Sequence, residues 1–229
     1  MKSPRADVAL GSIAEQITSC RRCERLVAHR ELVAREKRAA YRDEAYWGRP
    51  VPGFGDPRAR LLLVGLAPGA HGANRTGRAF TGDRSGDFLY AALHRAGLAS
   101  QPSSSHRGDG LSLRGVFITL PVRCAPPDNK PSREEIAACF PFFEREVAAL
   151  SSVRAILALG AIALASVARL TQVELGFEHG ASGRGRLAGR PCAVFASYHV
   201  SQQNTQTGRL TAAMFDDVLH RAWAAASLK

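Results

Sequence analysis

Four short apolar runs divide the chain, at residues 61–65, 116–120, 155–159 and 193–197. Within each run, apolar residues follow one another directly and do not alternate with polar ones. Such runs are typical of strands that are buried on both faces. They therefore predict a four-stranded parallel sheet at the centre of the protein.

Helical patterns lie before, between and after these runs. Apolar residues recur at helical spacing in 88–93, 162–170 and 210–218, and the first 40 residues form another helical region. The apolar side of that region consists of Ile13, Ile17, Cys20, Leu26 and Val27. Alternating strands and helices predict an α/β protein with helices on both faces of the sheet.

A further helix is predicted from its capping signal. Ser132 and Glu135 form a capping box ahead of the apolar Ile136, because together they satisfy two free backbone N–H groups at a helix start. Pro141 then interrupts the pattern. Proline lacks the N–H that a helix interior needs, so we expect either a kink or the start of a second helix there.

The length of 229 residues allows one large α/β domain or two small ones. No repeat and no second domain is evident, so we expect a single domain over residues 1–229, with an N-terminal helical segment at about residues 1–45. Residues 47–58, 97–114 and 178–190 are rich in glycine, proline, serine or arginine and are predicted to be loops.

The charge of the chain indicates a polyanionic partner. There are 31 Lys and Arg residues against 20 Asp and Glu, which leaves a net charge of +11 spread along the sequence. The guanidinium group suits phosphate because of its planar fork. A generally basic proteome is the alternative explanation. No apolar run approaches the roughly 18 residues of a membrane helix, and no signal peptide is evident. We therefore expect a cytoplasmic protein with no membrane partner.

Four of the five cysteines could share a metal centre. Cys20 and Cys23 form a CxxC pair, and Cys124 and Cys139 follow much later in the chain. Four thiolates suit either a structural zinc ion or a [4Fe–4S] cluster. The alternative is two buried core cysteines and an unrelated CxxC pair. Cys192 lies in an apolar run, and we expect it to be buried as a small hydrophobic residue.

Three polar loops follow predicted strands, at 65–87, 121–131 and 198–210. In open parallel sheets ligands bind at the carboxyl ends of the strands, so we expect these loops to converge on one cleft. The first contains GLAPGAHGANRTGRAFTGD, whose glycines let backbone N–H groups approach a ligand. It matches neither a Walker A loop nor GxGxxG.

Several side chains in this first loop have two interpretations. Phe80 either anchors the loop on the core or offers a stacking surface to a flat ligand. Asp83 is either a functional carboxylate or the N-cap of the next helix, a position that Ser85 could equally fill. Asp87 falls in the first turn of that helix, where an acid favours the helix dipole, and we interpret it as structural.

The last loop, SYHVSQQNTQTGR at 197–209, combines a histidine with amides, hydroxyls and a closing arginine. Such a set suits phosphate groups or base edges. The alternative is an ordinary solvent-exposed turn in which His199 is a loop histidine with satisfied hydrogen bonds.

The two loop motifs and the cysteine pattern together resemble the uracil-DNA glycosylase superfamily, specifically its iron–sulfur-containing family 5. The resemblance runs from about Cys20 to the C-terminal helix. It implies a pocket for a flipped-out deaminated base in single- or double-stranded DNA, and hydrolysis of the N-glycosidic bond to leave an abasic site. It also implies a monomer, and a [4Fe–4S] cluster in preference to zinc on the ligands Cys20, Cys23, Cys124 and Cys139.

The resemblance suggests roles for individual residues. Asp83 would orient the attacking water, and His199 would donate a hydrogen bond to the departing base. Asn129 is a further pocket candidate, unless it only shapes a proline-bounded turn. Other residues would bind the base (Gly69, Ala70 and Phe80) or the DNA backbone (Ser201, Asn204 and Arg209).

The sequence also departs from related family 4. Leu66 stands where family 4 carries a glutamate, and Leu120 stands where it carries a uracil-reading asparagine. Both departures fit family 5, which resembles family 4 but accepts more bases, including hypoxanthine and xanthine. We expect Arg75 and Arg78 to contact phosphate or to lie on a solvated loop.

Two other classes of function are compatible with parts of the sequence. A non-catalytic nucleic-acid-binding protein stapled by a metal or cluster would explain the charge, the cysteines and the polar loops. An enzyme acting on free nucleotides would explain the α/β pattern but would leave the charge incidental. Neither explains why Phe80, Asp83 and His199 should share a cleft.

Overall fold

The four apolar runs form the parallel centre of the sheet in the computed structural model, which describes residues 4–228. They are β2 (Leu61–Val64), β3 (Val116–Thr119), β4 (Ala155–Leu159) and β6 (Arg190–Ser197). β3 pairs with β2, β2 with β4, and β4 with β6, all in parallel. The predicted α/β class is confirmed. Residues 1–3 and 229 of the expected domain lie outside the described part.

Two short edge strands complete the sheet, and the apolar pattern does not predict them. β1 (Phe54–Gly55) pairs with β3, and β5 (Ser182–Leu187) pairs with β6, both antiparallel, so the strand order is β1-β3-β2-β4-β6-β5. The prediction of four strands is therefore too low. The predicted loops over 47–58 and 178–190 are wrong where β1 and β5 lie and at residue 190, where β6 begins. Edge strands can form without an apolar pattern, because backbone pairing on one side suffices and most of their side chains are only half-buried or exposed.

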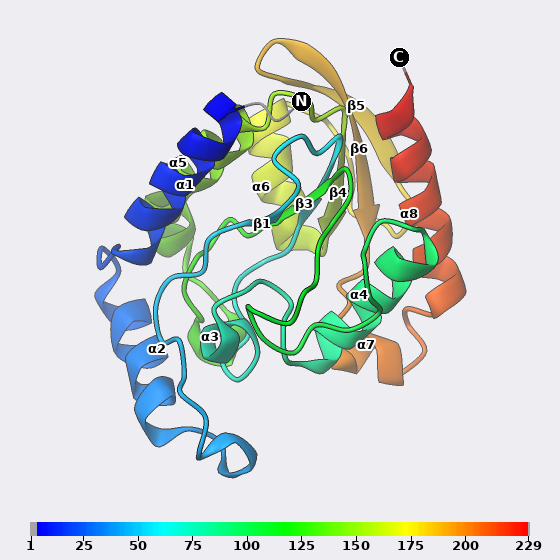
Figure 1. Cartoon of the computed structure of the whole chain (residues 1–229). Coiled ribbons are helices and arrows are strands. Elements are labelled where there is room, and N and C mark those ends of the chain that lie inside the picture. Colours follow the sequence, from blue (N-terminus) through cyan, green and yellow to red (C-terminus); the bar gives the residue numbers. More distant parts are fainter. Residues whose placement is uncertain (1–3, 229) are drawn as a thin grey trace.

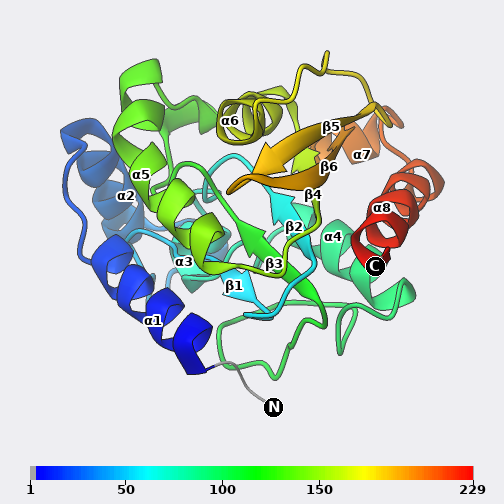
Figure 2. The same ribbon diagram turned by 90° about the horizontal axis from the view of Figure 1, so that it is seen from above.

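Helices cover both faces of the sheet, as Figures 1 and 2 show. The long ones are α1 (Pro4–Thr18), α2 (Glu24–Glu36), α4 (Arg84–Arg95), α5 (Arg133–Ala149), α6 (Ala161–Thr171) and α8 (Ala212–Ser227). Leu61 and Leu63 pack on the face covered by α4 and α8, while Leu62 and Val64 pack on the face covered by α5 and α6. Every residue of β2 is therefore buried, which explains its continuous apolar run. No helix among residues 4–228 is long and apolar enough to cross a membrane.

The N-terminal helical pattern is two helices, and the CxxC pair lies at the break between them. Cys20 follows α1, and Cys23 is the N-cap residue of α2. The predicted capping box is present at the start of α5: Ser132 Oγ accepts from Glu135 N–H at 3.2 Å, and Glu135 Oε2 accepts from Ser132 N–H at 2.7 Å. Pro141 lies inside α5, so a second helix does not start there.

Shorter elements shape the loops, namely η1 (Ala39–Tyr41), α3 (Ala73–Thr76), η2 (Pro127–Asn129) and α7 (Gln202–Gln206). α3 and α7 lie at the same end of the sheet in Figure 1. β3 lies on one side of β2 and β4 lies on its other side, so the strand order reverses between β3 and β4. Such a reversal opens a crevice at the carboxyl ends of the strands.

A buried carboxylate joins β3 to the loops around it. Glu146 in α5 accepts hydrogen bonds from the Gly53 N–H at 2.8 Å, from Arg123 Nη2 at 2.9 Å and from the Thr119 hydroxyl. The side chains of Glu146 and Arg123 are 3% and 2% exposed. A buried ion pair of this kind is strongly destabilising to break, because the remaining charge is left unpaired in a poorly solvated site.

Replacing Glu146 with glutamine should therefore lower the free energy of unfolding by about 3–5 kcal/mol. For a chain of this length that corresponds to a fall in Tm of about 10 °C. The matched control is Glu174→Gln, because Glu174 is exposed. Calorimetry would check the result, and equal Tm values for the two variants would show that the Glu146 network does not stabilise the fold.

Candidate active site

One pocket of about 340 Å³ lies at the carboxyl ends of the parallel strands. The loops after β2, β3 and β6 all line it, as the sequence predicts. Its walls include Leu66, Ala67, Gly69, Phe80, Asp83, Ser85, Leu120, Asp128, Asn129, His199, Ser201 and Gln203. The volume suits a flat ligand of modest size, and the lining combines apolar walls with a few polar groups.

Phe80 is both a core residue and a wall of the pocket. Only 8% of it is exposed, and its ring lies against the ends of β2 and β3. A Cβ at Gly65 would come within 2.6 Å of the Phe80 ring and 2.8 Å of Leu120. Only glycine therefore allows the ring to lie there. Phe80 has a φ of +51°, a backbone conformation that is uncommon for an aromatic residue and that recurs at functional sites.

Asp83 is the N-cap of α4, so the alternative cap at Ser85 is excluded. Its Oδ1 accepts a hydrogen bond from the Gly86 N–H at 3.0 Å. The other oxygen lies against the glycines of the first loop: a Cβ at Gly69 would lie 3.0 Å from Oδ2, and a Cβ at Gly72 would overlap Oδ2. The cap thus holds one carboxylate oxygen, while the absence of side chains at these glycines makes room for the other.

Burial is the main influence on the charge of Asp83. It raises the pKa of the carboxyl above its ordinary value, and backbone hydrogen bonds from Gly86 and Ser85 limit the rise. Asp87 adds to the rise through like charge, and Arg75 opposes it. A carboxylate with these neighbours is a stronger base than an exposed one, which is the property that a water-activating group needs.

His199 lines the same pocket as Asp83 and lies next to Phe80. The His199 and Phe80 ring centroids are 6.1 Å apart, with the planes tilted by 33°. Burial lowers the pKa of His199 to about 4, so the imidazole is neutral at pH 7. Among residues 4–228 its ring nitrogens have no hydrogen-bond partner, which leaves a donor available to a ligand.

The remaining predicted pocket residues are distributed unevenly. Gly69 lines the pocket, and Asn129 lies exposed at its edge with a φ of +56°. Ala70 is not among the lining residues, and its carbonyl accepts a hydrogen bond from Asn74 Nδ2 at 3.4 Å. Leu66 and Leu120 add apolar surface to the pocket wall. The sequence did not mark Gly72 as special beyond its place in a glycine-rich loop.

The polar residues of the last loop mostly support the loop itself. Ser201 caps α7 through Asn204 N–H at 3.4 Å, and Asn204 Nδ2 donates to the His199 carbonyl at 2.8 Å. Ser201 also lines the pocket. Arg209 is exposed, with its guanidinium 4.6 Å from the centre of the Tyr198 ring. Contacts of these three residues with DNA stay a prediction.

Arg75 and Arg78 hold the first loop together from inside. Arg75 pairs with Glu44 and donates to the Gly82 carbonyl at 2.7 Å. Arg78 pairs with Asp109 at 2.6 Å, and the two side chains are 4% and 6% exposed. The expectation of a solvated loop is wrong for both arginines. Their guanidinium donors are already engaged by the protein, so phosphate contact finds no support.

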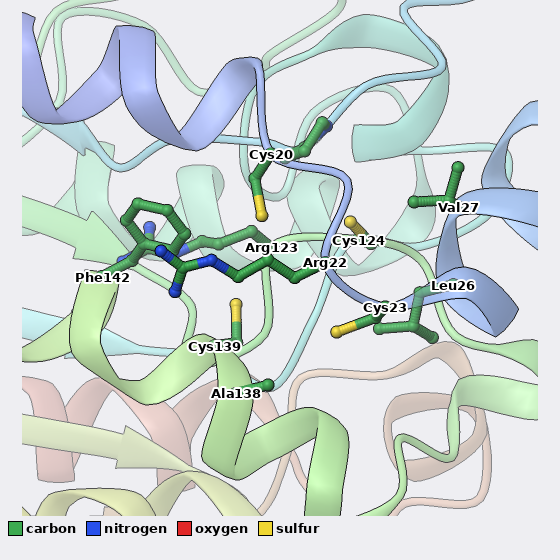
Figure 3. Close-up of a pocket in the computed structure, with 11 residues that line it drawn as sticks. Cys20, Arg22, Cys23, Leu26, Val27, Arg123, Cys124, Ala138, Cys139 and Phe142 are labelled. Atoms are coloured by element: carbon green, nitrogen blue, oxygen red, sulfur yellow. The ribbon is translucent and has the colours of Figure 1, made fainter.

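The four cysteines of the predicted cluster line a second pocket. Figure 3 shows the sulfur atoms of Cys20, Cys23 and Cys139 directed into one space, with Cys124 beside it. All four are free thiols. Within the described residues no three His, Cys, Asp or Glu side chains form a group that could hold a metal ion. Cys192 lies elsewhere and is buried, as expected.

Buried positive charge surrounds these thiols. Arg30 donates to Cys124 Sγ at 3.2 Å, and Arg123 lines the pocket. Arg30 Nε and Arg123 Nε and Nη1 are buried without a partner in the described part of the chain. Burial raises the pKa of Cys124 to about 12 and of Cys139 to about 11. Buried guanidinium N–H groups without a partner suit a site whose natural occupant brings negative charge.

Known proteins match the chain over nearly its whole length. The model of the uracil DNA glycosylase superfamily matches residues 52–223. The type-5 uracil-DNA glycosylase of Thermus thermophilus is 54% identical over 219 residues, which cover 92% of this chain and 95% of that protein. Those of Mycobacterium leprae (54% over 220 residues; 93% and 95%) and Pyrobaculum aerophilum (45% over 212 residues; 90% and 89%) are also similar. The chain therefore belongs to the uracil DNA glycosylase superfamily, within its type-5 family.

Proposed function

We propose that the protein removes uracil from DNA by hydrolysing the N-glycosidic bond, which leaves an abasic site for base excision repair. The observation that carries this proposal is the single pocket in which Phe80, Asp83 and His199 meet. A base inside a duplex cannot reach such a pocket, so the target nucleotide is flipped out. The net charge of +11 favours a polyanionic substrate.

The substrate range extends to other deaminated bases such as hypoxanthine and xanthine. Phe80, Leu66 and Leu120 provide apolar surface, which holds any flat base without reading its polar edge. The neutral hydrogen-bond donor of His199 is equally undemanding, since each of these bases carries a carbonyl oxygen.

The pocket residues divide the reaction between them. Cleavage of the N-glycosidic bond develops positive charge on the sugar and negative charge on the departing base. The Asp83 carboxylate orients and activates the attacking water, and its negative charge also stabilises the sugar cation. The neutral His199 imidazole donates a hydrogen bond to the base as its oxygen becomes negative. Phe80 holds the ring of the base by stacking.

Duplex oligonucleotides carrying one uracil, hypoxanthine or xanthine would test this assignment. After incubation with the protein, alkali should break the strand at the lesion, because an abasic site is alkali-labile. Binding without breakage would instead indicate a non-catalytic nucleic-acid-binding protein.

Replacing Asp83 with asparagine should reduce the single-turnover rate of base release by about 10²- to 10⁴-fold. DNA affinity should change little, because asparagine keeps the shape and the capping oxygen. Gel assays and fluorescence anisotropy would measure the two effects. An Asp83→Asn variant as active as the parent would remove Asp83 from the mechanism.

The same variant should be at least as stable as the parent at pH 7. Because burial raises the folded-state pKa of Asp83 above the unfolded value, the ionised form costs stability at pH values above the folded pKa. That cost disappears as the pH falls through the folded pKa. Asparagine removes this cost, so the Tm difference between variant and parent should shrink on acidification.

The parent's rate of base release should fall at acidic pH as Asp83 becomes protonated. The Asp83→Asn variant should not show this fall, because it has no carboxylate to protonate.

Replacing Gly72 with alanine should displace the Asp83 carboxylate, because the new Cβ would overlap Oδ2. A shift of this kind costs about 100-fold in rate. Gly176→Ala is the matched control, since nothing lies within 4 Å of a Cβ there. If both variants cleave uracil-containing DNA like the parent, the space at Gly72 has no part in positioning Asp83.

We also infer that Cys20, Cys23, Cys124 and Cys139 hold a [4Fe–4S] cluster. Four thiolates in one pocket are a cluster ligand set, and the unpaired donors of Arg30 and Arg123 fit its negative charge. A cluster with four irons reaches thiolates that do not converge on one point, as a single zinc ion would require. Its contribution in this position is to staple α2 to α5 and to the segment after β3.

Purified protein should then contain about four iron atoms per chain. Cys124→Ser should lose iron and lower the Tm, because ligation contributes to folding. Cys192→Ser should keep full iron, since Cys192 lies outside the pocket. Iron and zinc analysis would decide the matter: stoichiometric zinc without iron, or equal iron in both variants, would contradict the assignment.

A further inference from the structure

A cluster of aromatic and cationic side chains lies beside the base pocket and takes no part in the mechanism above. Tyr198 is at its centre. The Phe177 ring centroid is 6.1 Å from that of Tyr198 at an angle of 59°, and the Arg209 guanidinium lies 4.6 Å from the Tyr198 ring centre. Tyr198 immediately precedes His199, so the cluster adjoins the wall of the pocket.

The cluster is held firmly by hydrogen bonds beneath it. His179 Nδ1 accepts from the Tyr198 N–H at 3.3 Å, and His179 Nε2 bonds to the Met214 carbonyl at 3.2 Å. The His179 ring also lies 5.2 Å from the Tyr198 ring. In addition, Gly180 N–H donates to the Ala196 carbonyl at 2.8 Å. The segment that carries Phe177 is thereby fixed against β6, and little ordering is needed when a partner binds.

Two members of the cluster, Phe177 and Arg209, are exposed to solvent. Phe177 is 37% exposed, a high value for a large apolar side chain. Arg209 is exposed and makes no ion pair with any residue in 4–228. An exposed ring and an exposed guanidinium, both lying against Tyr198, present one stacking surface and one phosphate contact.

We propose that Phe177 stacks on the base of a nucleotide adjacent to the flipped one in the same strand, while Arg209 contacts the phosphate that joins the two. Backbone continuity keeps that neighbour close to the pocket, and flipping removes one of its stacking partners. The neighbouring base therefore gains most from a new aromatic surface. The proposal rests on the proposed function, because it requires DNA with a flipped base in the pocket.

Glu178 provides an internal check on the electrostatics. This exposed carboxylate follows Phe177 directly, and its charge opposes an approaching phosphate. Glu178→Gln should therefore tighten DNA binding, whereas Phe177→Ala and Arg209→Gln should weaken it. A change that only disturbed the fold would not improve binding.

The decisive experiment is a double-mutant cycle between protein and DNA. Dissociation constants are measured in the Asp83→Asn background, with uracil oligonucleotides that keep both neighbours of the target or carry an abasic analogue at one of them. Phe177→Ala should weaken binding about tenfold on the complete oligonucleotide. The loss should disappear when the stacked neighbour is already absent, since the two changes remove the same interaction.

Controls distinguish this contact from other effects. Phe177→Leu keeps apolar bulk and should weaken binding like Phe177→Ala, while Val8→Ala, at a 72% exposed position on α1, should bind like the parent. An abasic analogue opposite the uracil should leave the Phe177 effect intact.

If Phe177→Ala shows no coupling to either neighbour while the Asp83→Asn protein binds uracil DNA, the proposal is overturned. If the parent does not bind uracil DNA at all, the proposed function itself fails.

Discussion

The site depends on one carboxylate that is held at a helix start. Asp83 caps α4 through the Gly86 N–H, which fixes one oxygen and aligns the group with the positive end of the helix. Gly72 leaves the space that the second oxygen occupies. Burial and the helix terminus thus act in opposite directions on the pKa of Asp83. The outcome is a carboxylate in the pocket that is immobile and more basic than an exposed one.

Polar links connect this loop to the cysteine pocket. Asn74 Nδ2 donates to the Arg30 carbonyl at 3.2 Å and to the Ala70 carbonyl at 3.4 Å, so it joins α2 to the turn beside the pocket. Arg25 in α2 in turn pairs with Glu135 in α5 at 2.7 Å. The helices α2 and α5 and the loop after β2 are therefore parts of one packed unit.

Much of the fold could be predicted because its centre obeys simple rules. A strand such as β4 is buried on both faces, and burial demands an apolar residue at every position. The capping box at Ser132 could also be predicted, because it depends only on Ser132 and Glu135, which are close together in the sequence. The edge strands β1 and β5 could not be predicted, because their pairing involves backbone atoms and leaves no signal in the side chains. Pro141 could not be interpreted alone either, since packing decides whether a helix continues through it.

The sequence alone determined the α/β class and the polar loops at the strand ends, because hydrophobic periodicity and residue chemistry are local properties. The roles expected for Asp83, His199 and Phe80 came from the resemblance of the two loop motifs to a known family. Only the tertiary structure decided that Asp83 is the helix cap, that Arg75 and Arg78 are buried and hold the first loop together, and that Phe177 and Arg209 both lie against Tyr198. These outcomes depend on which distant backbone segments lie together, and on burial and charge at that place, which no local pattern specifies.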